Sequence, residues 1–242
     1  MARSTSVLVP LAVLKGETLS EPTAELLSSV DVVLVGYHEL PDQTATEQAR
    51  DQYGSRLSRR LDEYASLFGD PDSLRTRTAF THSPQQTIER VAVEEQTTAI
   101  LLANPAPAIR RVLVALRGPV NLAQLTSTTA DIVAETDCEI CLYHAAHPKT
   151  DSDAGHQLLS TATTKLEAAG VEPSRITTQL DVTRSPLRAI TTAADDAEFV
   201  IIGERKPSLV DHIFGDVADR LAAATAGPVL VVRKLCLEPE NK

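Results

Sequence analysis

A glycine-containing loop in the last third of the sequence has the residue types that bind a phosphate group. Gly203 directly follows the apolar run Phe199–Ile202, and Gly215 stands further along the same loop. Glycine lets backbone N–H groups approach a phosphate closely, and the N-terminus of a following helix favours negative charge. Arg205 and Lys206 add two cations, although a solvated charge pair is the alternative interpretation of these two residues. The loop is therefore a candidate anion site.

Asp216, directly after Gly215, argues against a phosphate ligand. Aspartate is an excellent N-cap residue, so the fold alone explains its presence at the start of a helix. Its carboxylate would accept hydrogen bonds from the same N–H groups that a phosphate needs, and it would repel the phosphate. We expect the protein to supply its own anion at this position.

The elements that position this loop form a strand, helix and strand. Phe199–Ile202 is short, branched and uninterrupted by polar residues, as is Val229–Val232, which is typical of strands buried on both faces of a parallel sheet. Gly227 and Pro228 end the helix before the second strand. Between the two strands, apolar residues recur at helical spacing: Val210, Ile213, Phe214, Val217 and Leu221. Ligands of open parallel sheets lie beyond the carboxyl ends of the strands, at such loops.

This stretch resembles the last third of the universal stress protein family. That family binds ATP through a glycine, two residues, a glycine, nine residues, and a glycine followed by serine or threonine. Gly203 and Gly215 occupy the outer glycine positions, Lys206 replaces the middle glycine and Asp216 replaces the serine or threonine. The loop is also one residue shorter than the pattern. The resemblance implies an ATP-binding motif in degenerate form.

The resemblance also implies contacts at the ends of two earlier strands. Arg117 aligns with an aspartate that reaches the ribose and adenine in ATP-binding members, and a guanidinium cannot accept those hydrogen bonds. Tyr143 or the adjacent His144 would flank adenine; the alternative for Tyr143 is a partly buried aromatic residue. Leu116 and Val217, which adjoin Arg117 and Asp216, complete the candidate set.

The same order of alternating strands and helices occurs twice in the chain, which predicts an α/β fold with doubly wound parallel sheets. The apolar run Val112–Leu116 repeats Val7–Leu11, and Phe199–Ile202 repeats the strand Thr98–Leu102. We expect a truncated domain over residues 1–106 and a complete domain over 107–242, each with its own sheet. The resemblance implies the strand order 3-2-1-4-5, the first copy lacking the last helix and strand.

The strand Val229–Val232 has no counterpart in the first copy. An apolar edge strand left bare is an aggregation hazard. We therefore expect it to pair with the same strand of a second chain, which would give a homodimer with a two-fold axis.

Composition limits the classes of partner. The chain carries 33 acidic against 23 basic residues, a net charge of −10, which argues against nucleic acid. No run is long and apolar enough for a membrane span or resembles a signal peptide, so we expect a cytoplasmic protein. Lysine is scarce relative to arginine, and acidic residues are plentiful; this balance resembles proteins from salt-loving cells, with an ordinary acidic protein as the alternative.

Two further chemistries are disfavoured by the pattern. Cys138, Cys141, His144 and His147 are spaced like metal ligands, but they fall on a predicted strand whose side chains alternate between faces. Reduced thiols without a metal are the better interpretation. No serine or histidine has an assignable partner for nucleophilic catalysis, and Ser83 is explained as the N-cap of a helix.

The sequence leaves three functions open. The favoured one is a non-enzymatic regulatory protein, degenerate in ATP binding, that acts through protein partners; the resemblance suggests membrane transporters. The second is a switch that responds to ATP or another adenosine ligand in the second domain. The third is a nucleotide-hydrolysing enzyme, which the absence of an evident nucleophile disfavours.

Overall fold

A computed structural model describes residues 5–117, 121–148, 152–204, 222–223, 225 and 227–233. Nine strands lie in these residues: β1 (Ser6–Leu11), β2 (Asp31–Glu39), β3 (Leu74–Thr81), β4 (Ala99–Leu102), β5 (Arg111–Leu116), β6 (Glu139–Ala146), β7 (Ile176–Val182), β8 (Phe199–Gly203) and β9 (Val229–Val232). Most are runs of branched apolar residues, as expected of strands buried on both faces.

Six α-helices of the described residues connect these strands. They are α1 (Glu21–Leu26), α2 (Thr46–Ala65), α3 (Pro84–Glu94), α4 (Leu122–Val133), α5 (Ser152–Ala168) and α6 (Pro186–Ala194). Three single 3₁₀ turns accompany them: η1 (Val13–Lys15), η2 (Pro71–Ser73) and η3 (Pro173–Arg175). None of the described helices is long and apolar enough to cross a membrane.

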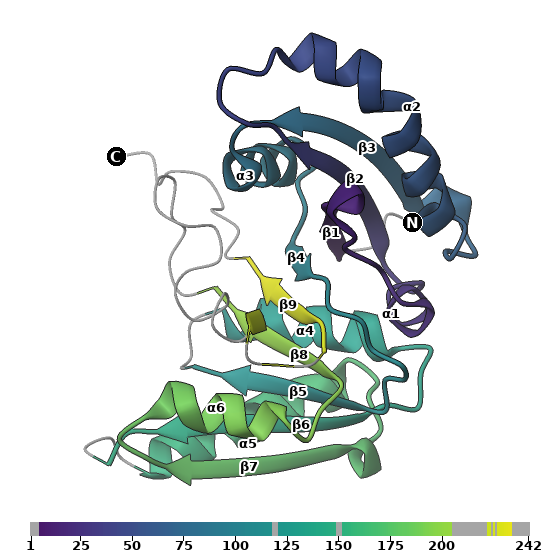
Figure 1. Ribbon diagram of the computed structural model, residues 1–242. Coiled ribbons are helices and arrows are strands. Elements are labelled where there is room, and N and C mark those ends of the chain that lie inside the picture. Colours follow the sequence, from purple (N-terminus) through teal and green to yellow (C-terminus); the bar gives the residue numbers. More distant parts are fainter. Residues whose placement is uncertain are drawn as a thin grey trace, which may run out of the picture.

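All nine strands form one sheet in the order β3-β2-β1-β4-β9-β8-β5-β6-β7. The second half has the predicted order 3-2-1-4-5, and the first half has 3-2-1-4 without a fifth strand. The expectation that each half has its own sheet is wrong, because β9 joins the two halves. Figure 1 shows β9, in yellow, between β4 of the first half and β8 of the second.

The predicted pairing of Val229–Val232 with a second chain is wrong for the same reason. β9 is parallel to β8 on one side and antiparallel to β4 on the other, with Leu230 opposite Leu101. Both edges of β9 are therefore paired within the chain. No strand of the first half pairs with the other edge of β4 among the described residues, and β9 pairs there. A dimer built on this strand has no free edge to use.

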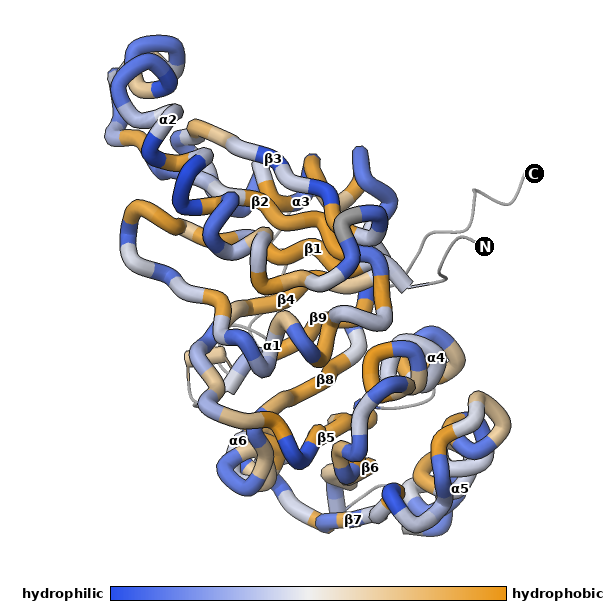
Figure 2. The backbone as a smooth tube through the Cα atoms, turned by 90° about the vertical axis from the view of Figure 1, so that its right-hand side faces the viewer, coloured by the Kyte–Doolittle hydropathy of each residue, from blue (hydrophilic) through white to orange (hydrophobic). Residues whose placement is uncertain are grey.

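Helices cover both faces of the sheet. In the second half, α4 and α5 lie on one side of the strands and α6 on the other (Figure 2). Side chains from α1, α2, α4 and α5 share one continuous core cluster that spans both halves. On the opposite face, α3 and α6 cover separate clusters, one in each half. The two halves are thus packed together mainly through one face.

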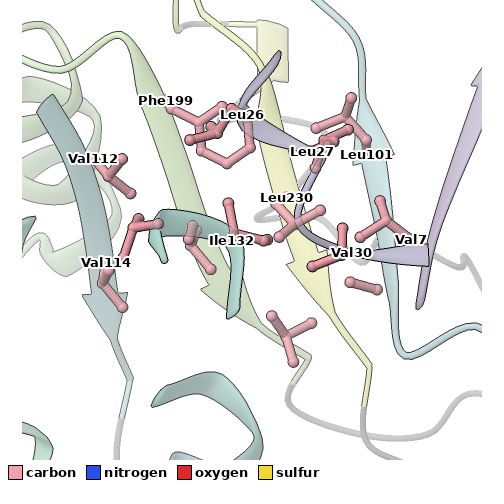
Figure 3. Packing of buried hydrophobic residues seen from close by; sticks show 14 of the residues in the cluster. Val7, Leu26, Leu27, Val30, Leu101, Val112, Val114, Ile132, Phe199 and Leu230 are labelled. Atoms are coloured by element: carbon pink, nitrogen blue, oxygen red, sulfur yellow. The ribbon is translucent and has the colours of Figure 1, made fainter. Parts of the chain in front are cut away.

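Leu230 lies at the centre of this shared core (Figure 3). It is fully buried, as are Leu101 of β4 and Ile132 of α4. Leu27 and Val30, from the segment after α1, reach the same cluster from the first half. The core therefore ties the first half to the helices of the second.

Three helix ends have local features that differ from the predicted helix caps or add to them. Ser83 precedes α3, but its side chain makes no capping hydrogen bond; instead its backbone N–H donates to Thr81 Oγ1 at 2.9 Å. Ser185 repeats this arrangement with Thr183 Oγ1 at 3.1 Å before α6. Gly170, which follows α5, has φ +95°, a left-handed conformation in which a side chain is strained.

Candidate functional site

The candidate site lies at the carboxyl ends of β5, β6 and β8, where parallel strands end together at one edge. Leu116 is the last residue of β5, and its backbone pairs with that of His144 on β6. Gly203 is the last residue of β8. The sheet thus brings together three of the positions that the sequence selected.

His144 is fixed by its neighbours at this edge. Its Nδ1 lies 2.7 Å from the carbonyl oxygen of Leu116, and because a carbonyl only accepts, Nδ1 donates and carries the proton. Helix α5 packs against the same ring at Gly155, where an added Cβ would lie 3.2 Å from His144 Cδ2 and 2.9 Å from Leu180 Cδ1. The ring remains partly exposed, and its Nε2 is left as an acceptor.

Tyr143 points to the opposite face of the sheet and is fully buried beneath α6. Its hydroxyl donates to Asp181 Oδ2 at 2.7 Å. Burial, and then this hydrogen bond to the carboxylate, raise the pKa of Tyr143 far above its usual value. The ring is therefore held neutral within the core. Asp181 was not singled out by sequence.

Arg117 directly follows β5 and is partly exposed. It stands at the carboxyl edge, at the position that the resemblance aligns with an aspartate. Gly203 has an ordinary backbone conformation, and an added Cβ would meet none of the described atoms within 4 Å. The packing of the described residues thus does not require glycine there. Arg205, Lys206, Gly215, Asp216 and Val217 lie outside the described residues.

The corresponding edge of the first half is closed by its own side chains. After β1, the backbone N–H of Ala12 donates to Glu17 Oε2 at 2.6 Å. The η1 turn that follows ends at Gly16, with φ +89°, and Lys15 forms an ion pair with Glu39 of β2. A carboxylate of the chain occupies the amide at the end of β1, which sequence reasoning missed because it examined only the second half there.

Arg233, just after β9, links the carboxyl edge of the second half to the first half. Its guanidinium donates to the carbonyl oxygens of Ala92 and Thr97, each at 3.1 Å, near the C-terminus of α3. Its own carbonyl oxygen accepts from Asn121 Nδ2 at 3.0 Å, and Asn121 precedes α4 of the second half. These bonds connect the loop after β5 to α3. Nothing in the sequence periodicity indicated them.

The cysteine and histidine cluster has no metal-binding arrangement among the described residues. The thiol of Cys138 donates to the carbonyl oxygen of Ile109 at 3.3 Å and is buried. Cys141 is partly exposed on the other face, and burial raises its pKa. Both thiols are free.

Comparisons with known proteins agree with this fold. A sequence model described as the universal stress protein family matches residues 108–233, slightly more than half of the chain. A crystal structure of a universal stress protein from Archaeoglobus fulgidus DSM 4304 is similar over 98% of each chain, with a TM-score of 0.60 and 14% identity. A functionally unknown protein from Pseudomonas aeruginosa PAO1 is similar over 94% of this chain and 92% of its own, with a TM-score of 0.52 and 15% identity. No curated protein matches the chain.

Proposed function

The chain belongs to the universal stress protein family, and we propose that it is a non-enzymatic regulatory protein whose ATP site in the second half is degenerate and which acts through protein partners. One observation carries the proposal: Tyr143, at one of the two positions expected beside adenine, is fully buried and bonded to Asp181. Because the ring of Tyr143 lies within the hydrophobic core, it could contact a ligand only if that core opened.

Other features of the edge support the same proposal. Arg117 brings a cation where family members that bind ATP have a carboxylate acceptor for the ribose and adenine. His144 is the remaining ring beside the edge, and its Nδ1 is already committed to Leu116. In the first half, Glu17 occupies the amide after β1. We propose that neither half binds ATP tightly, and that surfaces rather than turnover carry the function.

Calorimetric titration of ATP into the wild type and Asp216→Ser tests the degenerate site. Serine keeps an N-cap, so we expect a change in folding stability within about 1 kcal/mol. Unit charges about 4 Å apart interact by roughly 4 kcal/mol at an effective dielectric near 20, which we take as an upper guide. A third of that energy corresponds to about a tenfold gain in affinity. Asp216→Glu, which keeps the charge, is the matched control and should gain nothing.

The double variant Asp216→Ser/Lys206→Gly asks whether close backbone approach is also limiting. It should exceed Asp216→Ser only if the middle glycine of the family pattern matters here. Tight ATP binding by the wild type, or no gain in either variant, would contradict the proposal of a degenerate loop. Release of ADP or phosphate during the titration would instead favour an enzyme.

The link through Arg233 favours a second candidate function, a switch that responds to an adenosine ligand. A ligand at the carboxyl edge of β5 would act through Asn121, whose side-chain amide donates to the carbonyl oxygen of Arg233. Arg233 in turn holds the C-terminus of α3 in the first half. Hydrogen exchange of α3 with and without ATP distinguishes the two: a ligand-dependent change supports the switch.

A further inference from the structure

A groove of about 540 Å³ lies between α6 and the strands β5, β6 and β7, on the face opposite α5. Its lining is mixed, and the apolar part consists of small or medium side chains, among them Leu113 and Cys141 on the strands and Ala189 and Ala193 on α6. The volume falls within the roughly 300–1,000 Å³ typical of small-molecule sites. Among the described residues, none of the candidate nucleotide residues lines it. The groove is therefore lined by other residues than the edge described above.

The first half shows how the same elements pack with larger side chains at the corresponding positions. There, Arg75 and Arg77 of β3 both form ion pairs with Glu95, at the end of α3; Arg75 Nη1 lies 2.8 Å from Glu95 Oε2. Register and the shared Thr–Ser turns place Thr177 and Gln179 of β7 at the positions of Arg75 and Arg77.

Helix α6 is also shorter than α3. It has 9 residues against 11, so the last two helical residues of α3, Val93 and Glu94, have no helical counterpart in α6. Ala193 stands where the first half has Val91, because both lie seven residues after the first helical proline in their copies. Beside the groove, the second half therefore lacks the two arginines, two helical residues and one branched side chain that the first half has.

Each end of the groove carries one cation and one carboxylate. Asp181, near the end of β7, and Arg188, in the first turn of α6, line the end at the carboxyl edge. Arg111 and Asp196 line the opposite end, where Arg111 Nη1 donates to the backbone oxygen of Asp196 at 3.2 Å. Asp181 is oriented by the hydroxyl of Tyr143 at 2.7 Å.

We propose that this groove binds a small zwitterion with an apolar side chain, of the amino-acid class. The guanidinium and carboxylate at one end would hold the carboxylate and ammonium of the ligand, and charge-assisted hydrogen bonds of this kind are stronger than neutral ones. The apolar part of the lining would accept the apolar side chain, which gains from leaving water. A ligand with only one charge would leave one charged group of the pair without a partner.

Calorimetric titration with three matched probes tests the charge requirement: L-phenylalanine, phenethylamine, which lacks the carboxylate, and 3-phenylpropanoate, which lacks the ammonium. L-Leucine and L-methionine extend the set. We expect at least one of the three amino acids to bind saturably, and at least tenfold more tightly than the amine or the acid. Equal binding of a singly charged probe, or no saturable binding of any amino acid, would overturn the proposal.

Variants locate the site. Ala193→Leu enlarges a side chain of the lining, and Arg188→Gln removes an exposed cation; each should weaken amino-acid binding at least tenfold. Ala168→Leu, at an exposed position of α5, is the matched control and should leave binding unchanged. Thermal midpoints confirm that each variant is folded. Binding that survives both groove variants would place the ligand elsewhere and refute the assignment.

Discussion

Leu230→Ala tests whether the two halves form one cooperative unit joined by β9. Leu230 is fully buried at the junction, opposite Leu101 of β4 and beside Ile132 of α4. Replacing a buried leucine by alanine costs the transfer free energy of the lost methyl groups and that of the cavity left behind. We expect a loss of about 2–5 kcal/mol in the free energy of unfolding.

This magnitude is a large share of the total stability of a domain, about 5–15 kcal/mol. The variant should therefore remain folded at low temperature but unfold at clearly lower urea concentration. Leu101→Ala removes the cross-strand partner. Because both changes enlarge the same cavity, the double variant should differ from the sum of the singles by about 0.5–3 kcal/mol. Val93→Ala, at a side chain that is 61% exposed, is the control and should change stability by less than about 0.5 kcal/mol.

Urea denaturation followed by circular dichroism gives the free energies, and hydrogen exchange reports each half separately. If β9 couples the halves, the slowest amides of β2 and β6 should lose protection by the same factor in Leu230→Ala. Loss confined to β5, β6 and β8, with β1 and β2 unchanged, would show that the halves unfold independently and would refute this reasoning.

Three further outcomes are expected. Gly227→Ala should lower stability by more than about 4 kcal/mol, since the new Cβ would lie 2.2 Å from the backbone oxygen of Glu198; Gly69→Ala, where a Cβ meets nothing within 4 Å, is the urea-denaturation control and should be near neutral. Burial, with nearby carboxylates adding, raises the pKa of Tyr37 from 10.0 to about 12. Its contribution to stability is therefore full below pH 10.0 and lost as the pH rises through about 12, and Tyr37→Phe should flatten this fall in thermal midpoints. With 33 acidic against 23 basic residues, screening of self-repulsion should raise the thermal midpoint from low to molar potassium chloride. A flat midpoint would contradict the salt-loving interpretation.

The strands themselves could be predicted because the pattern is strong and local, whereas their order within each half was implied by the family resemblance. Runs such as Phe199–Ile202 and Val229–Val232 have no polar residue on either face, so they fit only a sheet covered on both sides. The partner of β9 could not be predicted in this way. An apolar run indicates that a strand is buried, but it does not show which neighbouring strand pairs with it. The open edge of Ala99–Leu102 was the only available signal for the pairing.

The site was less predictable because its geometry depends on side chains that cross between strands. Tyr143 pairs in register with Gln179, yet its hydroxyl reaches Asp181, two residues further along β7. A period of two assigns a face but does not show which diagonal neighbour is in reach. Likewise, the bond between Ala12 and Glu17 depends on the η1 turn rather than on any spacing typical of a motif.

The junction shows what the first half contributes to the second. A second half alone would expose the outer edge of β9, a run of four apolar residues that are all buried in the chain. Such an edge pairs readily with other chains. β4 covers it with an antiparallel ladder, and Arg233 fastens the end of β9 to α3. A complete first copy would bring its own fifth strand to the edge of β4, leaving β9 a different partner. The free edge of β4 and the burial of β9 therefore depend on each other.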